Sequence, residues 1–356
     1  MTYKKNFLAI ITLIAIVLLC IAVFNYKTDP EHIFMNRGKA EKKIADLLLR
    51  KKNVANADKY DERLIHKYAI DGNSKKKDVL IFGSSRVMLI NNYLVPKQTF
   101  FNHGVPAGTI EDYMAIHQIY KEKNLLPKKI IIGIDPWALN ANNEIERWES
   151  LGEEYIRACN NLKINKNAYD EKILYKKYLK LVSMPYLHAS YVSIKKPNKI
   201  KYYATKATKL PVYIKIFDGT TSYPEKTINP PHDEIKKMAI EYAEKNPIFY
   251  LGNFKNLDGN KIEKYDKLIS ELQKEKIEVI IFLLPYHPIA YNAIKNNRKY
   301  AMVLQAENYF IKFAKEHQIK IIGSYDPDKC NLSEDGFYDG EHAKTESVDK
   351  ILRGQL

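Results

Sequence analysis

The sequence is poor in cysteine, with only three in 356 residues: Cys20, Cys159 and Cys330. Three cysteines do not make a disulfide framework. Cys159 and Cys330 would pair only in an oxidising compartment, and their spacing does not distinguish a disulfide from two ordinary thiols. Cys20 follows two leucines rather than a small residue, which argues against attachment of a lipid to this cysteine.

Signatures for metals and nucleic acids are also missing. No cysteine lies in a C-x-x-C pair or a metal-like cluster, so we predict no metal and no cofactor. No arginine-rich or RNA-binding motif accompanies the net charge of +15, so nucleic acid is not expected as a partner. The charge suits anionic lipid headgroups or an anionic envelope polymer, although an AT-rich genome would enrich lysine in the same way.

One long apolar run is present, near the N-terminus. Phe7–Phe24 has no charged residue and would span about 27 Å as a helix, close to the thickness of the hydrocarbon core of a bilayer. The run is too long for a cleaved signal peptide and no A-x-A-like site follows it. Because Lys4 and Lys5 precede it, we predict a single-pass signal anchor (residues 1–27) with a cytoplasmic N-terminus. The rest of the chain is expected outside the cytoplasm, in the periplasm or at the cell surface.

Residues 28–77 are predicted to form a charged juxtamembrane region. Within it, the spacing of apolar residues over 37–52 predicts an amphipathic helix. Its apolar positions are Ala40, Ile44, Leu47 and Leu48. The opposite face is mostly lysine and arginine, and it lies either along the membrane surface or in solvent.

From residue 78 onward, strand and helix patterns alternate. This alternation predicts an α/β fold in which a five-stranded parallel sheet is covered by helices on both faces, a three-layer αβα arrangement. The expected strands are 79–82, 99–102, 129–134, 278–284 and 320–323, and the expected helices are 109–123, 261–274, 289–317 and 344–353. About 140 residues separate the third and fourth strands, too many for a plain loop. With helical patterns at 144–161 and 170–182, this gap predicts a helical insertion at about 141–256 in a domain of residues 78–356.

Two polar motifs follow predicted strands, at the sheet edge where α/β proteins place their chemistry. The first is the turn Gly83-Ser84-Ser85, which taken alone is better explained as a helix cap. The second contains Asp339 and His342, a spacing that lets the carboxylate hold the imidazole while the far nitrogen acts as a base. A serine hydroxyl needs such a base to become a nucleophile.

A third block, Asn102–Thr109, follows the second strand, and the order of the three motifs resembles the SGNH (GDSL-type) hydrolase superfamily. The resemblance covers nearly all of the domain and implies a flavodoxin-like SGNH fold. It implies that Ser85 is the nucleophile, His342 the base and Asp339 the acid that orients it. Ser84 occupies the position usually held by aspartate. The layout is similar to a membrane-anchored subgroup that includes the D-alanyl transfer protein of teichoic-acid modification.

The resemblance also implies an oxyanion hole made by backbone N–H groups. The second block places one donor at Ala107, with Gly108 as the adjacent alternative, and Ser85 supplies another. The asparagine donor that the family has after its third block is missing, because Asp135 stands there. An ionised Asp135 would repel an oxyanion, so we expect it to position Arg86, His103 or the substrate.

Six residues at this edge are candidate substrate contacts: Arg86, Asn102, His103, Asp135, Tyr286 and His287. Four of them have plain structural alternatives. Arg86 would only pair with Asp135, His103 would lie in the core, and the prolines beside Tyr286 and His287 would only stiffen a turn.

The leading hypothesis is a membrane-anchored, extracytoplasmic serine acyltransferase or esterase that acts on a cell-envelope polysaccharide or glycopolymer through an acyl-serine intermediate. The resemblance implies a membrane-bound O-acyltransferase as a candidate partner. The triad does not separate hydrolysis from transfer, and the anchor favours transfer because it holds the site near a membrane-derived donor. The alternative is a catalytically idle SGNH-like domain that binds envelope polysaccharide or an O-acyltransferase.

Overall fold

The structure is a computed structural model that describes residues 2–31, 33–35, 37–143, 145–164, 175–195 and 201–356. Its centre is a five-stranded parallel sheet with the strand order β3-β2-β4-β8-β9. The strands are β2 (Val79–Phe82), β3 (Phe100–Asn102), β4 (Lys129–Gly133), β8 (Glu278–Leu283) and β9 (Lys320–Gly323). Each lies within one residue of its predicted bounds, which confirms the α/β class and the parallel sheet.

Alternate residues of the central strands face two separate cores. Leu80 and Ile130 lie in one apolar cluster, whereas Val79 and Ile131 lie in the other. Burial on both faces explains why these strands are continuous apolar runs instead of alternating polar and apolar residues.

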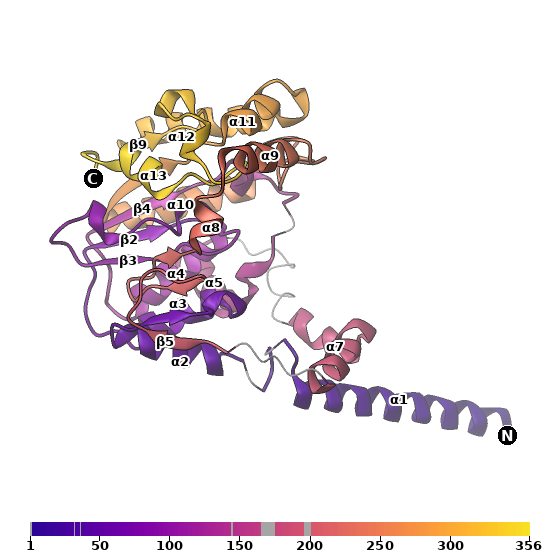
Figure 1. Cartoon of the computed structure of the whole chain (residues 1–356). Coiled ribbons are helices and arrows are strands. Elements are labelled where there is room, and N and C mark those ends of the chain that lie inside the picture. Colours follow the sequence, from indigo (N-terminus) through magenta and orange to yellow (C-terminus); the bar gives the residue numbers. More distant parts are fainter. Residues whose placement is uncertain (1, 32, 36, 144, 165–174, 196–200) are drawn as a thin grey trace.

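Helices cover both faces of this sheet (Figure 1). One face packs against several helices, and the other is covered by α13 and its neighbouring loops. The helices of the α/β unit are α4 (Ile110–Glu122), α10 (Gly259–Lys274), α11 (Pro288–Lys295), α12 (Ala301–Glu316) and α13 (Thr345–Leu352). Short 3₁₀ turns connect them: η2 (Ser85–Val87), η3 (Asn92–Leu94), η4 (Pro136–Leu139), η7 (Arg298–Tyr300), η8 (Asp328–Cys330) and η9 (Glu334–Gly336).

The single helix predicted at 289–317 is wrong, because the chain breaks it into α11, η7 and α12. The break falls at Asn296 and Asn297. The side chain of Asn297 accepts a hydrogen bond from the N–H of Lys299 (3.0 Å) and so starts a new turn. Asparagine side chains compete in this way with the helix backbone for donors.

The region before residue 78 folds together with the insertion. Its elements are α2 (Lys39–Leu49), β1 (Asn53–Ala55), η1 (Ala57–Lys59) and α3 (Glu62–Asp71). The predicted helix at 37–52 is confirmed as α2, and Ile44 and Leu48 are buried in an apolar cluster with Ile65 of α3. The apolar face of α2 therefore packs inside the protein, and Lys42 and Lys43 of its basic face are exposed.

The insertion, predicted to be helical, also contributes strands. Its described elements are η5 (Arg147–Leu151), α5 (Gly152–Asn161), η6 (Lys180–Val182), α7 (Met184–Lys195), β5 (Tyr203–Thr205), β6 (Ile214–Lys215), β7 (Thr221–Ser222), α8 (Glu225–Ile228) and α9 (His232–Ala243). The strands β5, β6 and β7 form an antiparallel sheet with β1 in the order β5-β1-β6-β7, in which β5 and β6 pair with β1 and β7 pairs with β6. Part of the predicted helix 170–182 lies outside the described residues, and its end is η6.

Helix α1 (Thr2–Thr28) projects from the rest of the molecule, at the opposite end from α11 and α12 (Figure 1). It is long and apolar enough to cross a membrane, and none of its most apolar stretch is buried.

Cys159 is a buried thiol in α5, and the partly buried thiol of Cys330 donates to the carbonyl of Ser324, so these cysteines do not form a disulfide.

Candidate active site

The end of β2 gives its two serines different roles. The hydroxyl of Ser84 accepts a hydrogen bond from the N–H of Arg86 (3.3 Å) and caps the short turn η2. Ser84 and Arg86 are buried, whereas Ser85 between them is only partly buried. The helix-cap explanation therefore applies to Ser84, whereas Ser85 keeps a partly exposed side chain.

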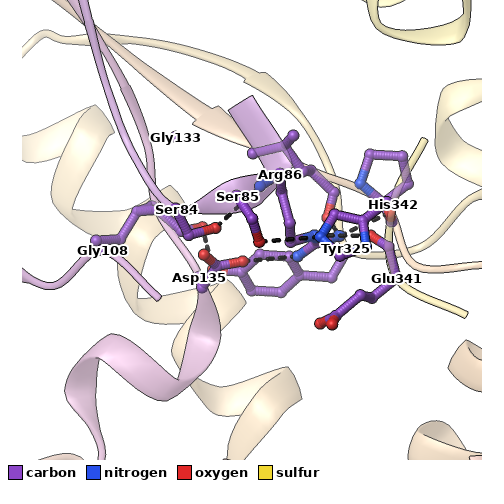
Figure 2. A network of polar contacts seen from close by, with 12 residues as sticks. Ser84, Ser85, Arg86, Gly108, Gly133, Asp135, Tyr325, Glu341 and His342 are labelled. Atoms are coloured by element: carbon purple, nitrogen blue, oxygen red, sulfur yellow. Dashed lines mark hydrogen bonds and ion pairs between the residues drawn. The ribbon is translucent and has the colours of Figure 1, made fainter. Parts of the chain in front are cut away.

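The structure brings Ser85, His342 and Asp339 into one hydrogen-bonded chain. Figure 2 shows the contact of Ser85 with His342. Ser85 Oγ lies 2.9 Å from His342 Nε2, and His342 Nδ1 lies 2.8 Å from Asp339 Oδ2. Because the carboxylate accepts at Nδ1, it fixes the tautomer in which Nε2 is the acceptor for the serine proton. These three residues come from opposite ends of the domain sequence, and only the parallel sheet places them together.

Backbone contacts hold this carboxylate and imidazole in place. Asp339 Oδ1 accepts hydrogen bonds from the N–H groups of Glu341 and His342, both at 2.8 Å. The ring of Tyr338 stacks on the imidazole, with centroids 5.3 Å apart and planes 8° from parallel. The imidazole thus has little freedom to leave the serine.

The electrostatics of the site favour a charged imidazole. Burial lowers the pKa of His342, but the charge and hydrogen bond of Asp339, together with the charge of Glu341, outweigh it and raise the pKa to about 9. Burial raises the pKa of Asp339, and the facing imidazole more than offsets this, so the net shift is downward. The pair is therefore an ion pair at neutral pH that must lose a proton before His342 acts as a base.

The loop after β3 presents backbone donors beside the serine turn. Ala107 has a left-handed backbone, with φ of 51°, an uncommon conformation for alanine. Among the described residues, no acceptor takes the N–H of Ala107 or of Ser85, whereas the N–H of Gly108 donates to Val105 O (3.0 Å). Of the two predicted alternatives, the geometry favours Ala107, since the Gly108 N–H is already used.

Gly108 has a different function in this loop. A Cβ atom at this position would lie 2.4 Å from the carbonyl oxygen of Gly83, which is closer than atoms approach without a clash. The absence of a side chain therefore lets the loop pack directly on the Gly83 backbone, beside the serine turn.

Arg63 of α3, which the sequence did not single out, supports this loop from behind. Its guanidinium forms a two-point ion pair with Asp112 (2.6 and 2.8 Å) and donates from Nη2 to the carbonyl of Pro106 (3.1 Å). The C=O of Pro106 and the N–H of Ala107 belong to one trans peptide and point in opposite directions. Binding the carbonyl thus turns the Ala107 N–H away from Arg63. In the sequence, Thr109 and Asp112 have the spacing of a helix cap. That pattern accounts for Asp112 without indicating a contact with Arg63.

Arg86 and Asp135 form a buried pair beneath the serine. Arg86 Nη1 donates to Asp135 Oδ1 (2.8 Å), and the guanidinium also donates to the carbonyls of Leu284, Pro285 and Glu341. These groups come from the ends of β4 and β8 and from the loop that carries His342. Arg86 is therefore not a substrate contact, because it is buried and its donors bind groups on three other segments of the site.

Asp135 occupies the position of the missing asparagine but accepts hydrogen bonds instead of donating them. It is buried, and Arg86 neutralises its charge at 2.8 Å. The alternative that Asp135 positions Arg86 agrees with this contact. The candidate oxyanion hole thus consists of backbone N–H groups from Ser85 and Ala107.

Asn102 and His103 are also corrected from substrate contacts to structural residues. Asn102 is fully buried and donates to the carbonyls of Val87 and Ile90, which ties the serine turn to β3. His103 is buried, and its Nε2 lies 2.7 Å from the hydroxyl of Tyr120. Burial lowers the pKa of His103 well below its usual range, so it is a neutral core histidine.

Tyr286 and His287 lie at the sheet edge but are fully buried, so neither is placed to contact a substrate. Arg86 lies over the ring of Tyr286, 4.2 Å from its centroid. His287 caps α11 by accepting a hydrogen bond from the N–H of Ile289 (3.2 Å). Tyr286 therefore packs against Arg86, and His287 fixes the start of α11.

A cavity of about 450 Å³ adjoins the Ala107 loop. It lies between the insertion and the region before residue 78. Its lining includes Arg63, Pro106, Met88, Tyr60, Tyr213 and Tyr223. No group of three or more metal-ligating side chains occurs in the part of the chain that the structure describes.

No family model matches the chain, and no curated protein is significantly similar to it. The functional interpretation therefore depends on the geometry of the site and on the sequence motifs.

Proposed function

We propose that the protein is a membrane-anchored, extracytoplasmic serine acyltransferase or esterase of the SGNH type that modifies a cell-envelope polysaccharide or glycopolymer. The observation that carries the proposal is the hydrogen-bonded chain from Ser85 through His342 to Asp339. A polar chain of this kind, with a partly exposed serine at its end, is the arrangement that activates a hydroxyl nucleophile.

The first half-reaction forms an acyl-serine. Ser85 Oγ attacks the carbonyl carbon of the acyl donor while His342 Nε2 takes the hydroxyl proton. The N–H groups of Ser85 and Ala107 stabilise the negative charge on the former carbonyl oxygen. The tetrahedral intermediate then breaks the bond to the donor's leaving group, which receives the proton from His342.

The second half-reaction returns the serine. His342 removes a proton from the hydroxyl of the acceptor, which attacks the acyl-serine carbonyl, and Ser85 leaves with the proton. Water as the acceptor gives an esterase, and a sugar or polyol hydroxyl gives a transferase. The tyrosines of the adjoining cavity suit a hydroxyl-rich acceptor, and an anchor at α1 would hold the site near a donor supplied by a membrane-bound O-acyltransferase.

Covalent labelling with a fluorophosphonate probe tests the nucleophile. We expect the full-length protein to be labelled, Ser85→Ala to lose all labelling, and Ser84→Ala, at the neighbouring capping serine, to retain it. Labelling that survives Ser85→Ala, or an unlabelled parent protein, would overturn the assignment.

A second candidate function is a catalytically idle SGNH-like domain that binds envelope polysaccharide or an O-acyltransferase. The observation that favours it is Asp135, which replaces a side-chain oxyanion donor and is neutralised by Arg86. Complementation of a deletion strain separates the two candidates. Full rescue by Ser85→Ala and by His342→Ala would favour the binding function, and failure of both would favour the enzyme.

A further inference from the structure

The segment 175–195 of the insertion is unusual for the surface of a folded domain, because many of its large apolar side chains are exposed. Leu179, Met184 and Ile194 are 69%, 69% and 61% exposed. The other exposed apolar and aromatic members of this patch are Tyr175, Tyr178, Val182, Tyr191 and Val192. So many exposed apolar side chains on one short segment indicate an interaction surface.

This segment is attached to the end of α1. Asn25 Nδ2 donates to the carbonyl of Leu181 (2.8 Å), and the hydroxyl of Tyr186 donates to Asp29 (3.1 Å). Asn25 directly follows the apolar run that ends at Phe24. If α1 crosses a bilayer, these contacts place the segment at the level where the hydrocarbon core meets the lipid headgroups.

Figure 1 shows α7 beside the end of α1 that joins the rest of the protein. Phe34, just after α1, packs against the rings of Tyr178 and Tyr186 at 6.0 and 6.1 Å, and Lys180 pairs with Glu31 at 2.6 Å. The patch is therefore held in a fixed position relative to α1 and continues its apolar surface.

The charge of the segment suits an anionic surface. It contains lysines but no aspartate or glutamate between residues 175 and 195. Lys177 lies over the ring of Tyr178 and Lys195 over the ring of Tyr191, at 5.3 and 4.6 Å from the centroids. Lysine and tyrosine with exposed aliphatic side chains are the combination found in helices that lie in a membrane interface.

We propose that segment 175–195 is a second membrane attachment, which inserts its apolar side chains into the headgroup region of an anionic bilayer beside α1. The anchor and this segment, about 150 residues apart in the sequence, then bind the same membrane. Two adjacent attachments restrict rotation about α1 and fix the orientation of the domain on the bilayer. The proposal depends on α1 lying in the membrane and is independent of the acyl chemistry.

Tryptophan quenching by brominated lipids tests this contact in the full-length protein. The two native tryptophans, Trp137 and Trp148, are 2% and 5% exposed, so they contribute a constant signal from the interior. Leu179→Trp and Ile194→Trp report on the patch in vesicles of phosphatidylcholine and phosphatidylglycerol brominated near the headgroup, and matched vesicles brominated near the ends of the acyl chains are used for the position deep in α1. Val17→Trp in α1 reports insertion of the anchor, and Ile311→Trp in α12, at the far end of the molecule, is the matched exposed control (Figure 1).

We expect the tryptophans at 17, 179 and 194 to lose most of their fluorescence and the one at 311 to keep it. Loss at 17 with none at 179 and 194 would overturn the proposal and would leave the patch for a membrane-protein partner. No loss at 17 would overturn it as well, because the anchor would then lie outside the bilayer. Equal quenching in vesicles of phosphatidylcholine alone would refute the part assigned to anionic lipid.

Discussion

At the residue scale, the central feature is the ion pair of Asp339 and His342. It orients the imidazole toward Ser85 but also holds a proton on it, since the pKa of His342 is raised to about 9. The neutral imidazole of such a histidine is a strong base, but only a small fraction of the molecules carry it at neutral pH. The candidate site therefore combines a suitable geometry with a protonation state that would slow the proposed reaction at neutral pH.

This balance predicts a steep pH profile. The rate of fluorophosphonate labelling of Ser85 should rise about tenfold per pH unit from neutral pH and level off near pH 9, because only neutral His342 accepts the proton. In Asp339→Asn the rise should shift toward the ordinary histidine range and the plateau should fall by up to about 10⁴-fold, since the tautomer is no longer fixed. A profile that is flat above pH 6 in the parent protein would contradict the assigned base.

The same shift has a consequence for stability. The pKa of His342 is about 9 in the folded state and about 6.5 in the unfolded chain. The ion pair therefore stabilises the fold fully below about pH 6.5. That contribution is lost as the pH rises through 9. Thermal unfolding of the parent and of His342→Gln should therefore converge at alkaline pH.

Arg63 gives the third prediction at this scale. In Arg63→Lys the charge beside Asp112 remains, but the planar fork that binds the Pro106 carbonyl is lost. We expect kcat for hydrolysis of a p-nitrophenyl ester to fall by about 10²-fold with an unchanged KM, because the oxyanion donor is misdirected. Arg157→Lys, which removes a partly exposed arginine paired with Glu122, is the matched control and should leave both constants unchanged. A change confined to KM at Arg63 would point to substrate binding instead.

At the element scale, the site is assembled by close contacts between loops at the carboxyl edge of the sheet. Arg86 joins the loops after β4 and β8 and the loop that carries His342, and Gly108 rests on the backbone of Gly83. Such contacts hold the serine turn, the Ala107 loop and the loop that carries His342 in place. They also explain why Arg86 and Asn102, despite lying within the motifs, are structural.

Gly108→Ala tests the close approach of these loops. The added Cβ would lie 2.4 Å from Gly83 O, so the loop must move, and we expect a loss of about 1–3 kcal/mol in the free energy of unfolding together with slower labelling of Ser85. Gly259→Ala, at the start of α10, has no heavy atom near the added group and is the control. It should be neutral or stabilising by up to about 1 kcal/mol in denaturant titration. Equal effects at the two glycines would contradict the predicted clash.

At the scale of the whole molecule, the region before residue 78 is part of the site's support. Strand β1 lies within the antiparallel sheet of the insertion, and Arg63 of α3 holds the Ala107 loop. The insertion reaches the site from the other side, where Tyr242 of α9 donates to Glu341 (2.9 Å). Segments far apart in the sequence therefore meet around the candidate site.

Two truncated chains separate the role of α1 from that of residues 29–77. A chain of residues 29–356 should fold and be labelled at Ser85, since it loses only α1. A chain of residues 78–356 should aggregate or stay unlabelled, because it exposes the core beneath α3 and removes Arg63. Normal labelling of the shorter chain would show that residues 29–77 are dispensable for the site.

The sequence by itself determined the local features of this protein. Continuous apolar runs predicted five parallel strands because burial on both faces leaves no polar positions, and Phe7–Phe24 predicted α1 because its length matches a bilayer. The spacing of Asp339 and His342 predicted their contact because three residues of a tight loop suffice to join them.

Only the tertiary structure decided which polar residues face the site. Arg86, Asn102, His103, Tyr286 and His287 occur at the predicted edge, but their neighbours come from other strands and bury them. Arg63 and segment 175–195 have no local motif, because a carbonyl contact and a place beside α1 arise from chain packing. Local patterns specify elements and short-range contacts, whereas long-range contacts decide whether a side chain supports the site or faces solvent.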